Sequence, residues 1–386
     1  MLKSIMENGT DRESALKILN NFIDNKLHNY ANKRNIDYGP GNHENISLLS
    51  PYIRNRIITE QEVINSVIEK FPLSRVEKFI QEIFWRTYWK GWLELRPKVW
   101  TDFIEDLRTI KEDEKYLKAV NGETEIECFN DWVKELKNFN YLHNHTRMLF
   151  ASIWIFTLGL PWQKGAEFFM QYLYDGDAAS NTLSWRWVAG IQTKGKNYLA
   201  QSWNISKFTN NKYKDVKLNE KALPILDKRE YKISPIQFSK SEEIREHIIV
   251  FENEMYIDFF DLKKYKKIYF VLLDNKNRSL KLSQKVIDYK KAVFKSQFNE
   301  YQFKAELLDE NGLANLIKNS KKFDVIYPSI GENFSFLKRL IKNNNLDINF
   351  VTRKEDEFCW KFSNKGYFNF KSNIPIILST FKLNQI

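Results

Sequence analysis

The segment between residues 141 and 187 constrains the fold of this chain more than any other. It carries tryptophans at positions 154, 162, 185 and 187, an Asn-x-x-Arg-Met run and an Asp-Gly-Asp triplet. Apolar walls with a few fixed polar groups suit a large conjugated cofactor, whose ring is buried while the polar groups set its orientation. The aromatic residues alone would favour a tryptophan-rich helical core. The polar groups placed among them favour a cofactor site.

Length and composition predict two globular domains and exclude several classes of protein. The chain has 386 residues, of which 43% are hydrophobic and 28% charged. No apolar run approaches the roughly 20 residues of a membrane span, and the N-terminus lacks the apolar core of a signal peptide. Cys128 and Cys359 are the only cysteines, so a four-thiolate cluster is excluded. We expect a cytoplasmic protein with no membrane partner and no metal site.

The net charge of +11 favours a polyanionic partner, because each neutralised phosphate releases condensed counterions. The alternative is compositional, since abundant Lys, Asn and Ile are typical of an AT-rich genome. The charge alone leaves both interpretations open.

The first 220 residues read as helical. Asp11 can cap a first helix, and Thr59 with Glu62 has the spacing of a capping box. Residues 29–51 are rich in Asn, Gly and Pro, which predicts an extended loop. A helix follows from Ser74, in which Glu82, Trp85 and Arg86 share one face. These three residues can read a ligand's polar edge and stack on its flat face, or form a surface ion pair beside a core tryptophan.

Beyond residue 243 the pattern alternates between strands and helices. Strands are predicted at 247–251, 267–273, 303–308, 323–327 and 348–352, with helices at 279–300, 311–320 and 333–344. This alternation predicts a parallel α/β sheet. No glycine-rich phosphate fingerprint accompanies it, because Gly331 stands alone. The expected architecture is a mainly α-helical domain at 1–220, a linker at 221–243 and a smaller, Rossmann-like α/β domain with a largely parallel sheet at 244–386.

An ordered set of motifs between residues 28 and 210 resembles the helical flavin-binding domain of the photolyase/cryptochrome family. The motifs are Tyr30-Ala-Asn-Lys-Arg34, Ser47-Leu-Leu-Ser-Pro-Tyr52, Glu82-Ile-Phe-Trp-Arg86, His143-Asn-His-Thr-Arg-Met148, Asp175-Gly-Asp-Ala-Ala-Ser-Asn181 and Trp185-Arg-Trp187. Any one of them is weak evidence, whereas their number and order are specific.

The resemblance implies FAD as the cofactor and assigns its contacts. The residues matched to the diphosphate end are Tyr30, Ser47, Leu49 and Ser50. Those matched to the flavin, ribityl and adenine parts are Arg86, Asn144, Arg147, Asp175 and Asp177. Asn181 matches the position that faces flavin N5, and Asn there resembles the repair enzymes.

The resemblance also implies a substrate site and an electron relay. The residues matched to the pocket for a flipped-out cyclobutane pyrimidine dimer in damaged DNA are Glu82, Trp85, Met148 and Trp187. A protonated Glu82 would serve as the polar donor to the dimer, since burial raises a carboxyl pKa. The tryptophans matched to the relay that reduces the flavin in light are Trp185, Trp162 and Trp100. The two-histidine arrangement of the six-four class is missing, because Asn144 and Met148 occupy those positions.

Two departures from the family pattern bear on function. Ile46 and Leu48 replace residues of the phosphate loop that are usually polar or basic. The family also places its α/β antenna domain first, whereas the similar pattern here comes last, as if circularly permuted. The expected activity is light-driven repair of cyclobutane dimers by a monomeric deoxyribodipyrimidine photolyase. A cryptochrome-like photoreceptor without repair activity and a flavin-binding relic are the alternatives. An antenna chromophore is possible in this family, but its identity does not follow from the sequence.

Overall fold

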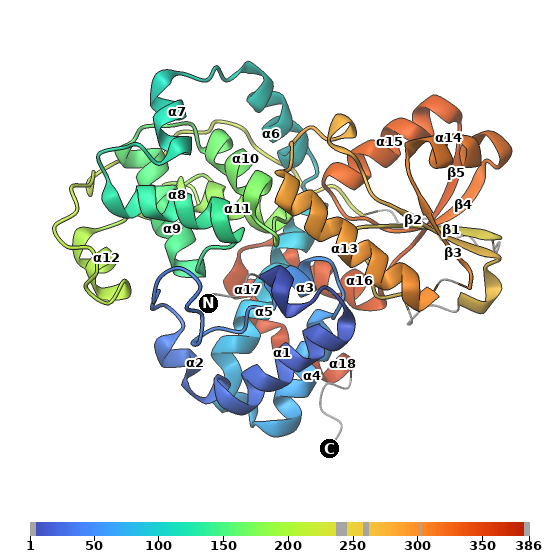
Figure 1. The fold of residues 1–386 in the computed structure, drawn as a ribbon, viewed down its shortest axis with the longest axis horizontal. Helices are drawn as coiled ribbons and strands as arrows, with labels where there is room; N and C mark the ends of the chain where they lie inside the picture. Colours follow the sequence, from blue (N-terminus) through green and yellow to red (C-terminus); the bar gives the residue numbers. More distant parts are fainter. Residues whose placement is uncertain (1–4, 237–244, 258–261, 302, 382–386) are drawn as a thin grey trace.

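The computed structural model describes residues 5–236, 245–257, 262–301 and 303–381. Figure 1 shows a large helical part beside a smaller α/β part, with α13 (Gln284–Tyr301) running between them. The predicted fold class, a mainly helical domain followed by a parallel α/β domain, is therefore confirmed.

The N-terminal part of the chain is helical throughout. Its elements are η1 (Ile5–Asn8), α1 (Arg12–Asn25), α2 (Leu27–Lys33), α3 (Ser50–Arg54), α4 (Glu60–Lys70), α5 (Leu73–Glu94), α6 (Lys98–Thr109), α7 (Glu114–Asn121), α8 (Glu127–Phe139), α9 (Asn144–Ser152), the π-helical turn η2 (Ile153–Thr157), α10 (Trp162–Tyr172), α11 (Ala178–Val188) and α12 (Ser202–Phe208). Within the described ranges, no helix combines the length and apolarity that a membrane crossing requires.

Local sequence signals account for several of these helix ends. The Asp11 side chain accepts from the backbone N–H of Ser14 and caps α1, as predicted. Thr59 and Glu62 form the predicted reciprocal capping box of α4. The predicted loop at 29–51 is wrong at its start, because α2 continues to Lys33. Its buried Leu27 packs with the core of α1, so tertiary packing outweighs the Asn-rich composition.

Five parallel strands form the sheet, in the order β3-β2-β1-β4-β5. Their bounds are β1 (His247–Phe251), β2 (Lys267–Val271), β3 (Ala305–Leu308), β4 (Lys322–Ile326) and β5 (Asp347–Val351), connected by η3 (Leu262–Lys264), η4 (Asn275–Asn277), α13, α14 (Glu310–Asn319) and α15 (Glu332–Asn344). Every predicted strand is present to within two residues. The strand order reverses between β1 and β4, which makes the carboxyl end of these two strands the topological switch point.

The two faces of the sheet pack against different helices. Residues at even positions of β1 and β2, such as Ile248 and Phe270, belong to the large core that continues into α13 and the helical part. Odd positions, such as Ile249 and Val271, face a second core formed with α14 and α15. This alternation follows from the two-residue period of a strand.

After β5 the chain returns to the helical part. α16 (Lys354–Trp360), η5 (Lys361–Asn364), α17 (Tyr367–Ser372) and α18 (Ile374–Thr380) follow, and the first three of them contact α5. Figure 1 shows α16, α17 and α18 among α1, α4 and α5. Part of the predicted linker, residues 237–243, lies outside the described residues. The predicted boundaries stay a prediction, and these contacts would assign residues 354–380 to the helical layer.

Buried ion pairs join the two parts of the chain. Arg56, 3% exposed, forms a bidentate pair with Asp356 of α16 at 2.6 and 2.7 Å and contacts Glu254 after β1 at 2.7 Å. Glu254 also accepts from Arg353 at 2.8 Å. Paired and hydrogen-bonded charges of this kind fix relative geometry, because any displacement would leave a charge buried alone.

Candidate functional site

Helix α5 carries the predicted polar and aromatic triplet. Glu82 accepts from Arg34, which follows α2, at 2.7 Å, and both side chains are partly exposed. Burial raises the pKa of Glu82, and the nearby charge of Arg34 opposes this rise only in part. Glu82 is therefore a carboxyl group that takes up a proton more readily than an exposed glutamate.

One turn further along α5, Arg86 pairs with two carboxylates. It lies 3.2 Å from Asp177 and 3.0 Å from Glu60. Burial alone would raise the pKa of Asp177, but the charge of Arg86 and a hydrogen bond from the backbone N–H of Ser180 hold it well below its usual value. Asp177 is also the N-cap of α11. The Asp-Gly-Asp triplet therefore starts a helix and presents an ionised carboxylate to α5.

The other carboxylate of the triplet, Asp175, joins two further predicted residues. Its Oδ2 atom accepts from Arg147 of α9 at 2.9 Å and from the hydroxyl of Ser50. Its Oδ1 atom is buried and has no hydrogen-bond partner among the described residues. The Arg147 guanidinium lies 5.0 Å from the ring of Tyr141, so it is held between a carboxylate and an aromatic face.

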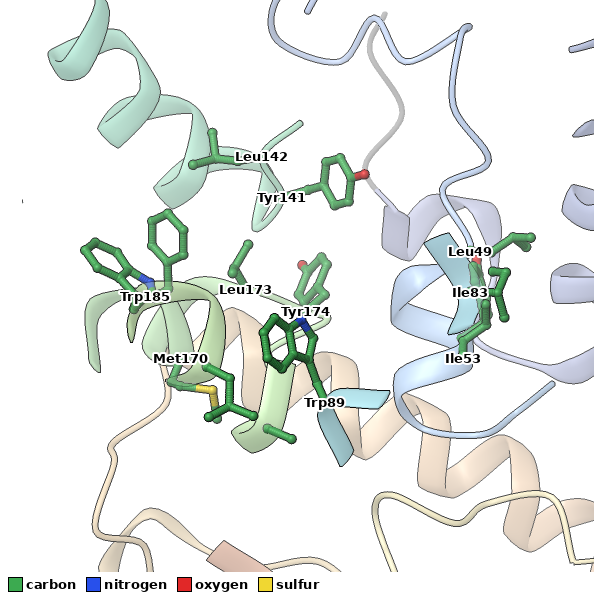
Figure 2. Packing of buried hydrophobic residues seen from close by; sticks show 14 of the residues in the cluster. Leu49, Ile53, Ile83, Trp89, Tyr141, Leu142, Met170, Leu173, Tyr174 and Trp185 are labelled. Atoms are coloured by element: carbon green, nitrogen blue, oxygen red, sulfur yellow. The ribbon is translucent and has the colours of Figure 1, made fainter. Parts of the chain in front are cut away.

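Apolar side chains next to Ser50 and Asp175 in the chain are buried in the core. Figure 2 shows Leu49 and Ile53 at α3, and Trp89 of α5 close to Leu173 and Tyr174, which follow α10. All five are at least 90% buried. The exposed Ser50 and Asn144 show that solvent reaches the polar groups. Apolar walls with a few fixed charges are the surroundings that the sequence predicted for a ring-shaped ligand.

The predicted phosphate loop has an unusual backbone. Leu48 adopts a φ of +57°, which is rare for a branched side chain. Ser47 accepts a long hydrogen bond from the backbone N–H of Leu49 at 3.4 Å, and Leu49 is fully buried. Tyr30 lies near Arg34 and Glu82, whose charges act on its hydroxyl. The turn at Leu48 lies directly before α3, whose first residue, Ser50, contacts Asp175.

Asn181 and Trp185 line the interior side of α11. The Asn181 amide donates to the backbone carbonyl of Ala166 at 2.8 Å, which ties α11 to α10. Trp185 is 2% exposed and packs edge-on against Phe169 at 5.1 Å. Gly165 of α10 lets the Trp185 indole pack directly against the α10 backbone. An added Cβ at Gly165 would lie 2.2 Å from that indole.

Gly165→Ala is therefore expected to destabilise the helical part by about 1–3 kcal/mol, the usual cost of overpacking a filled core. Denaturant unfolding followed by tryptophan fluorescence measures this. The comparison is Gly366→Ala, where an added methyl meets nothing within 4 Å. Equal effects of the two changes would contradict the packing argument.

The tryptophans predicted to form a relay fall into two groups. Trp100 and Trp162 both pack against Phe103, at 5.6 and 5.5 Å. Trp185 instead contacts Trp154 at 6.2 Å, edge to face. Trp154, predicted as core, is fully buried. Trp100 is also buried and donates to Ser335 of α15 at 3.3 Å.

The remaining predicted residues lie at the rim of the site. Asn144 and Met148 are on α9, where Asn144 is exposed and Met148 partly exposed. Trp187 is partly exposed and stacks on Tyr198 at 5.6 Å. Among the described residues, no hydrogen bond or ion pair joins these three residues to the carboxylate pairs. Their predicted roles stay predictions.

The structure adds charged residues that sequence reasoning missed. At the switch point, Glu252 after β1 contacts Arg54 at 3.2 Å, Arg278 at 2.6 Å and Lys290 at 3.1 Å. Glu94 accepts from Tyr327, and burial raises the pKa of Glu94 to about 7. Arg54 lies two residues after the Ser-Pro-Tyr motif, and this proximity was a signal in the sequence.

A small cavity lies among these interdomain charges. It has a volume of about 40 Å³ and is lined by Arg86 and Asp177 on one side and by Glu252 and Glu332 on the other. Most of the side chains that line it are charged or polar. The identity of any antenna chromophore stays open.

Comparison with known proteins agrees with this geometry. The family described as the FAD binding domain of DNA photolyase matches residues 79–267. Deoxyribodipyrimidine photo-lyase of Agrobacterium fabrum is 33% identical over 184 residues, which are 46% of this chain and 37% of that protein. The enzyme of Thermus thermophilus is 30% identical over 186 residues, 46% of this chain and 42% of that protein.

Among solved structures, a bacterial class III photolyase from Agrobacterium tumefaciens aligns with a TM-score of 0.45 at 25% identity, covering 52% of this chain and 43% of that one. The chain spans about two fifths of the length of the curated relatives it matches. The fold and the ordered motifs define a flavin-domain-like helical bundle. Residues 79–267 of this chain are similar to the FAD binding domain of DNA photolyase.

Proposed function

We propose that the chain binds FAD and uses light to split cyclobutane pyrimidine dimers in DNA. The observation that carries this proposal is the grouping on α5, where Glu82 and Trp85 lie beside the Arg86–Asp177 pair. A polar donor and an aromatic face would meet the lesion next to the residues that would hold the flavin. The named activity of the relatives supports this reading.

The described residues fit FAD. The Asp175 Oδ1 atom is buried without a donor, and a ribityl hydroxyl or a ring N–H would supply one. Arg147 and Arg86 carry the positive charge that an anionic reduced flavin and its diphosphate require. The residues that would hold the cofactor are Tyr30, Ser47, Leu49, Ser50, Arg86, Asn144, Arg147, Asp175, Asp177 and Asn181. When bound, FAD supplies a light-excited electron donor.

The lesion pocket would be formed by Glu82, Trp85, Met148 and Trp187. A flipped dimer needs aromatic and apolar walls that replace its lost stacking. Because burial raises the pKa of Glu82, this carboxyl can hold a proton and donate it in a hydrogen bond to a pyrimidine carbonyl. Trp185, Trp162 and Trp100 would form the relay, and the contacts of Trp162 and Trp100 with Phe103 support its outer part.

DNA is the macromolecular partner that the charge favours. The net charge of +11 would attract the phosphate backbone before the lesion is engaged. The small interdomain cavity contributes no lesion contact to this proposal. The α/β part would correspond to the antenna domain of the relatives, placed after the helical part.

One experiment tests the proposal. The purified protein is reduced, mixed with an oligonucleotide containing a cyclobutane dimer, and illuminated with blue light. Loss of dimers, measured by restored absorbance at the pyrimidine band, supports repair. Flavin that is photoreduced while dimers persist would instead support a photoreceptor, and absence of bound flavin would reject the cofactor assignment.

Glu82→Ala is expected to lower the repair yield about tenfold, because a hydrogen bond to a group that develops charge is lost. Flavin content, measured by absorbance, should stay unchanged. Glu77→Ala, on the solvent side of the same helix, is the control. An unaltered repair yield in Glu82→Ala would remove this residue from the lesion pocket.

A further inference from the structure

The C-terminal helices pack tightly along α5. Gly91 of α5 allows this contact, since an added Cβ would lie 2.5 Å from the hydroxyl of Ser363 and 2.7 Å from the ring of Trp360. Tyr88 donates to the backbone carbonyl of Lys365 at 3.0 Å. Residues more than 260 positions away in sequence thus become part of the surroundings of the candidate lesion site.

Tyr367, the first residue of α17, stacks on Trp85. The two ring centroids are 3.4 Å apart and the planes differ by 11°. Tyr367 is 8% exposed, and its hydroxyl donates to the backbone carbonyl of Gln81 at 2.9 Å. The ring is therefore fixed by both stacking and a hydrogen bond.

The geometry of α5 shows which face of Trp85 this tyrosine covers. At about 100° per residue, Glu82 and Arg86 lie on one side of Trp85 around the helix axis, and Gln81 and Tyr88 lie on the other. Tyr367 bonds to Gln81 and packs edge-on against Tyr88 at 5.4 Å.

The neighbouring aromatic residue of α17 lies on that same side of α5. Phe370 contacts Phe84 at 6.0 Å and Tyr88 at 5.7 Å. α17 thus covers the side of Trp85 that faces away from Glu82 and Arg86. On the side toward these two residues Trp89 contacts the indole at 5.2 Å, and Trp85 stays partly exposed, so part of the indole remains open to a ligand.

We propose that Tyr367 is a positioning residue, which holds the Trp85 indole in the plane that a flipped pyrimidine dimer stacks on. This inference rests on the proposed function for its substrate. An indole that is already fixed loses little rotamer freedom when a base stacks on it. Tyr367 would therefore raise the affinity for the dimer without touching the lesion. The C-terminal helices, which follow the α/β part in this chain, would thereby complete the substrate site.

The positioning itself is tested without substrate. The protein is labelled with 5-fluorotryptophan, and the Trp85 signal is assigned by its disappearance in Trp85→Phe. Tyr367→Leu, which keeps apolar volume but removes the stacked ring, is expected to shift and broaden this ¹⁹F signal. Tyr367→Phe, which keeps the ring, should leave it near the wild-type position. Phe368→Ala, on an 86% exposed neighbour, is the control.

The consequence for the substrate is tested by binding. Tyr367→Leu is expected to raise the dissociation constant for a dimer-containing oligonucleotide about threefold to tenfold, the usual effect of one side chain that must be ordered on binding. Affinity for undamaged DNA and FAD content should not change, and Tyr367→Phe should bind like the wild type.

The outcomes separate this inference from the proposed function. Wild-type protein that does not prefer the dimer would reject the proposed function, and the ¹⁹F signal would still decide whether Tyr367 holds Trp85. An unchanged Trp85 signal in Tyr367→Leu would overturn the positioning role. Tighter dimer binding by Tyr367→Leu would also overturn it, because Tyr367 would then block the indole surface on which the dimer stacks.

Discussion

Glu252→Gln is expected to lower the free energy of unfolding by about 3–5 kcal/mol, the cost of removing one partner from a buried charge cluster. Glu252 is 1% exposed and is contacted by Arg54, Arg278 and Lys290. A glutamine in its place would leave three cations together in the interface between the helical and α/β parts. Denaturant unfolding followed by circular dichroism measures the loss.

The control for this change is Glu246→Gln. Glu246 forms an ion pair with Lys266, but both side chains are well exposed, so little measurable change is expected. An equal loss in both variants would show that the Glu252 cluster stabilises the interface no more than a surface pair does.

The same carboxylate predicts a pH dependence. Burial would raise the pKa of Glu252, but the charges of Arg278, Lys290 and Arg54 hold it well below the usual value. A carboxyl group with a lowered pKa in the folded state stabilises the fold above its unfolded pKa of about 4.3, and this contribution is lost as the pH falls further. The stability difference between wild type and Glu252→Gln should therefore be full above about pH 5 and shrink in more acidic solution.

Sequence patterns predicted local structure well because their causes are local. The Thr59–Glu62 capping box and the short, continuously buried apolar run of β1 depend on residues a few positions apart. The start of the loop predicted at 29–51 was wrong because the packing of Leu27 stabilises α2 as far as Lys33, and that packing depends on distant residues. Secondary structure thus followed from short-range chemistry except where the core intervened.

The sequence predicted which residues belong to the candidate site, but not which of them contact one another. The motifs named Asp175, Arg147 and Ser50, and the structure joins them through one carboxylate. No local pattern indicates that Arg56 pairs with Asp356 or that Tyr367 stacks on Trp85, since each pair is separated by more than 280 positions. These contacts exist because the helices that follow β5, the last strand of the sheet, pack back on the helical part.

The C-terminal helices α16 and α17 pack on α5 and so affect both the stability of the helical part and the candidate site. The same α5 helix carries Glu82 and Arg86 on one side and receives α16 and α17 on the other. Loss of the C-terminal helices would therefore expose the apolar back of the candidate site. Helices from both ends of the chain enclose these motifs, because packing depends on spatial rather than sequential neighbours.

Asp175→Asn is expected to weaken FAD binding about tenfold to one hundredfold, because hydrogen bonds to a charged group are lost where the cofactor would lie. Asp175 contacts both Arg147 and Ser50, and its Oδ1 atom, which has no partner among the described residues, is the proposed acceptor for the cofactor. An amide of the same shape keeps the packing but removes the charge that balances Arg147. The dissociation constant of FAD for the apoprotein, followed by flavin fluorescence, measures the effect.

The matched control for Asp175→Asn is Asp24→Asn, which removes an exposed carboxylate paired with Lys70. It should bind FAD like the wild type. If Asp175→Asn also retained full affinity while its unfolding curve matched the wild type, the Asp-Gly-Asp triplet would be a helix-starting turn and nothing more. Because Asp177, the cap of α11, is intact in this variant, a loss of affinity without a loss of the fold would place the cofactor at Asp175.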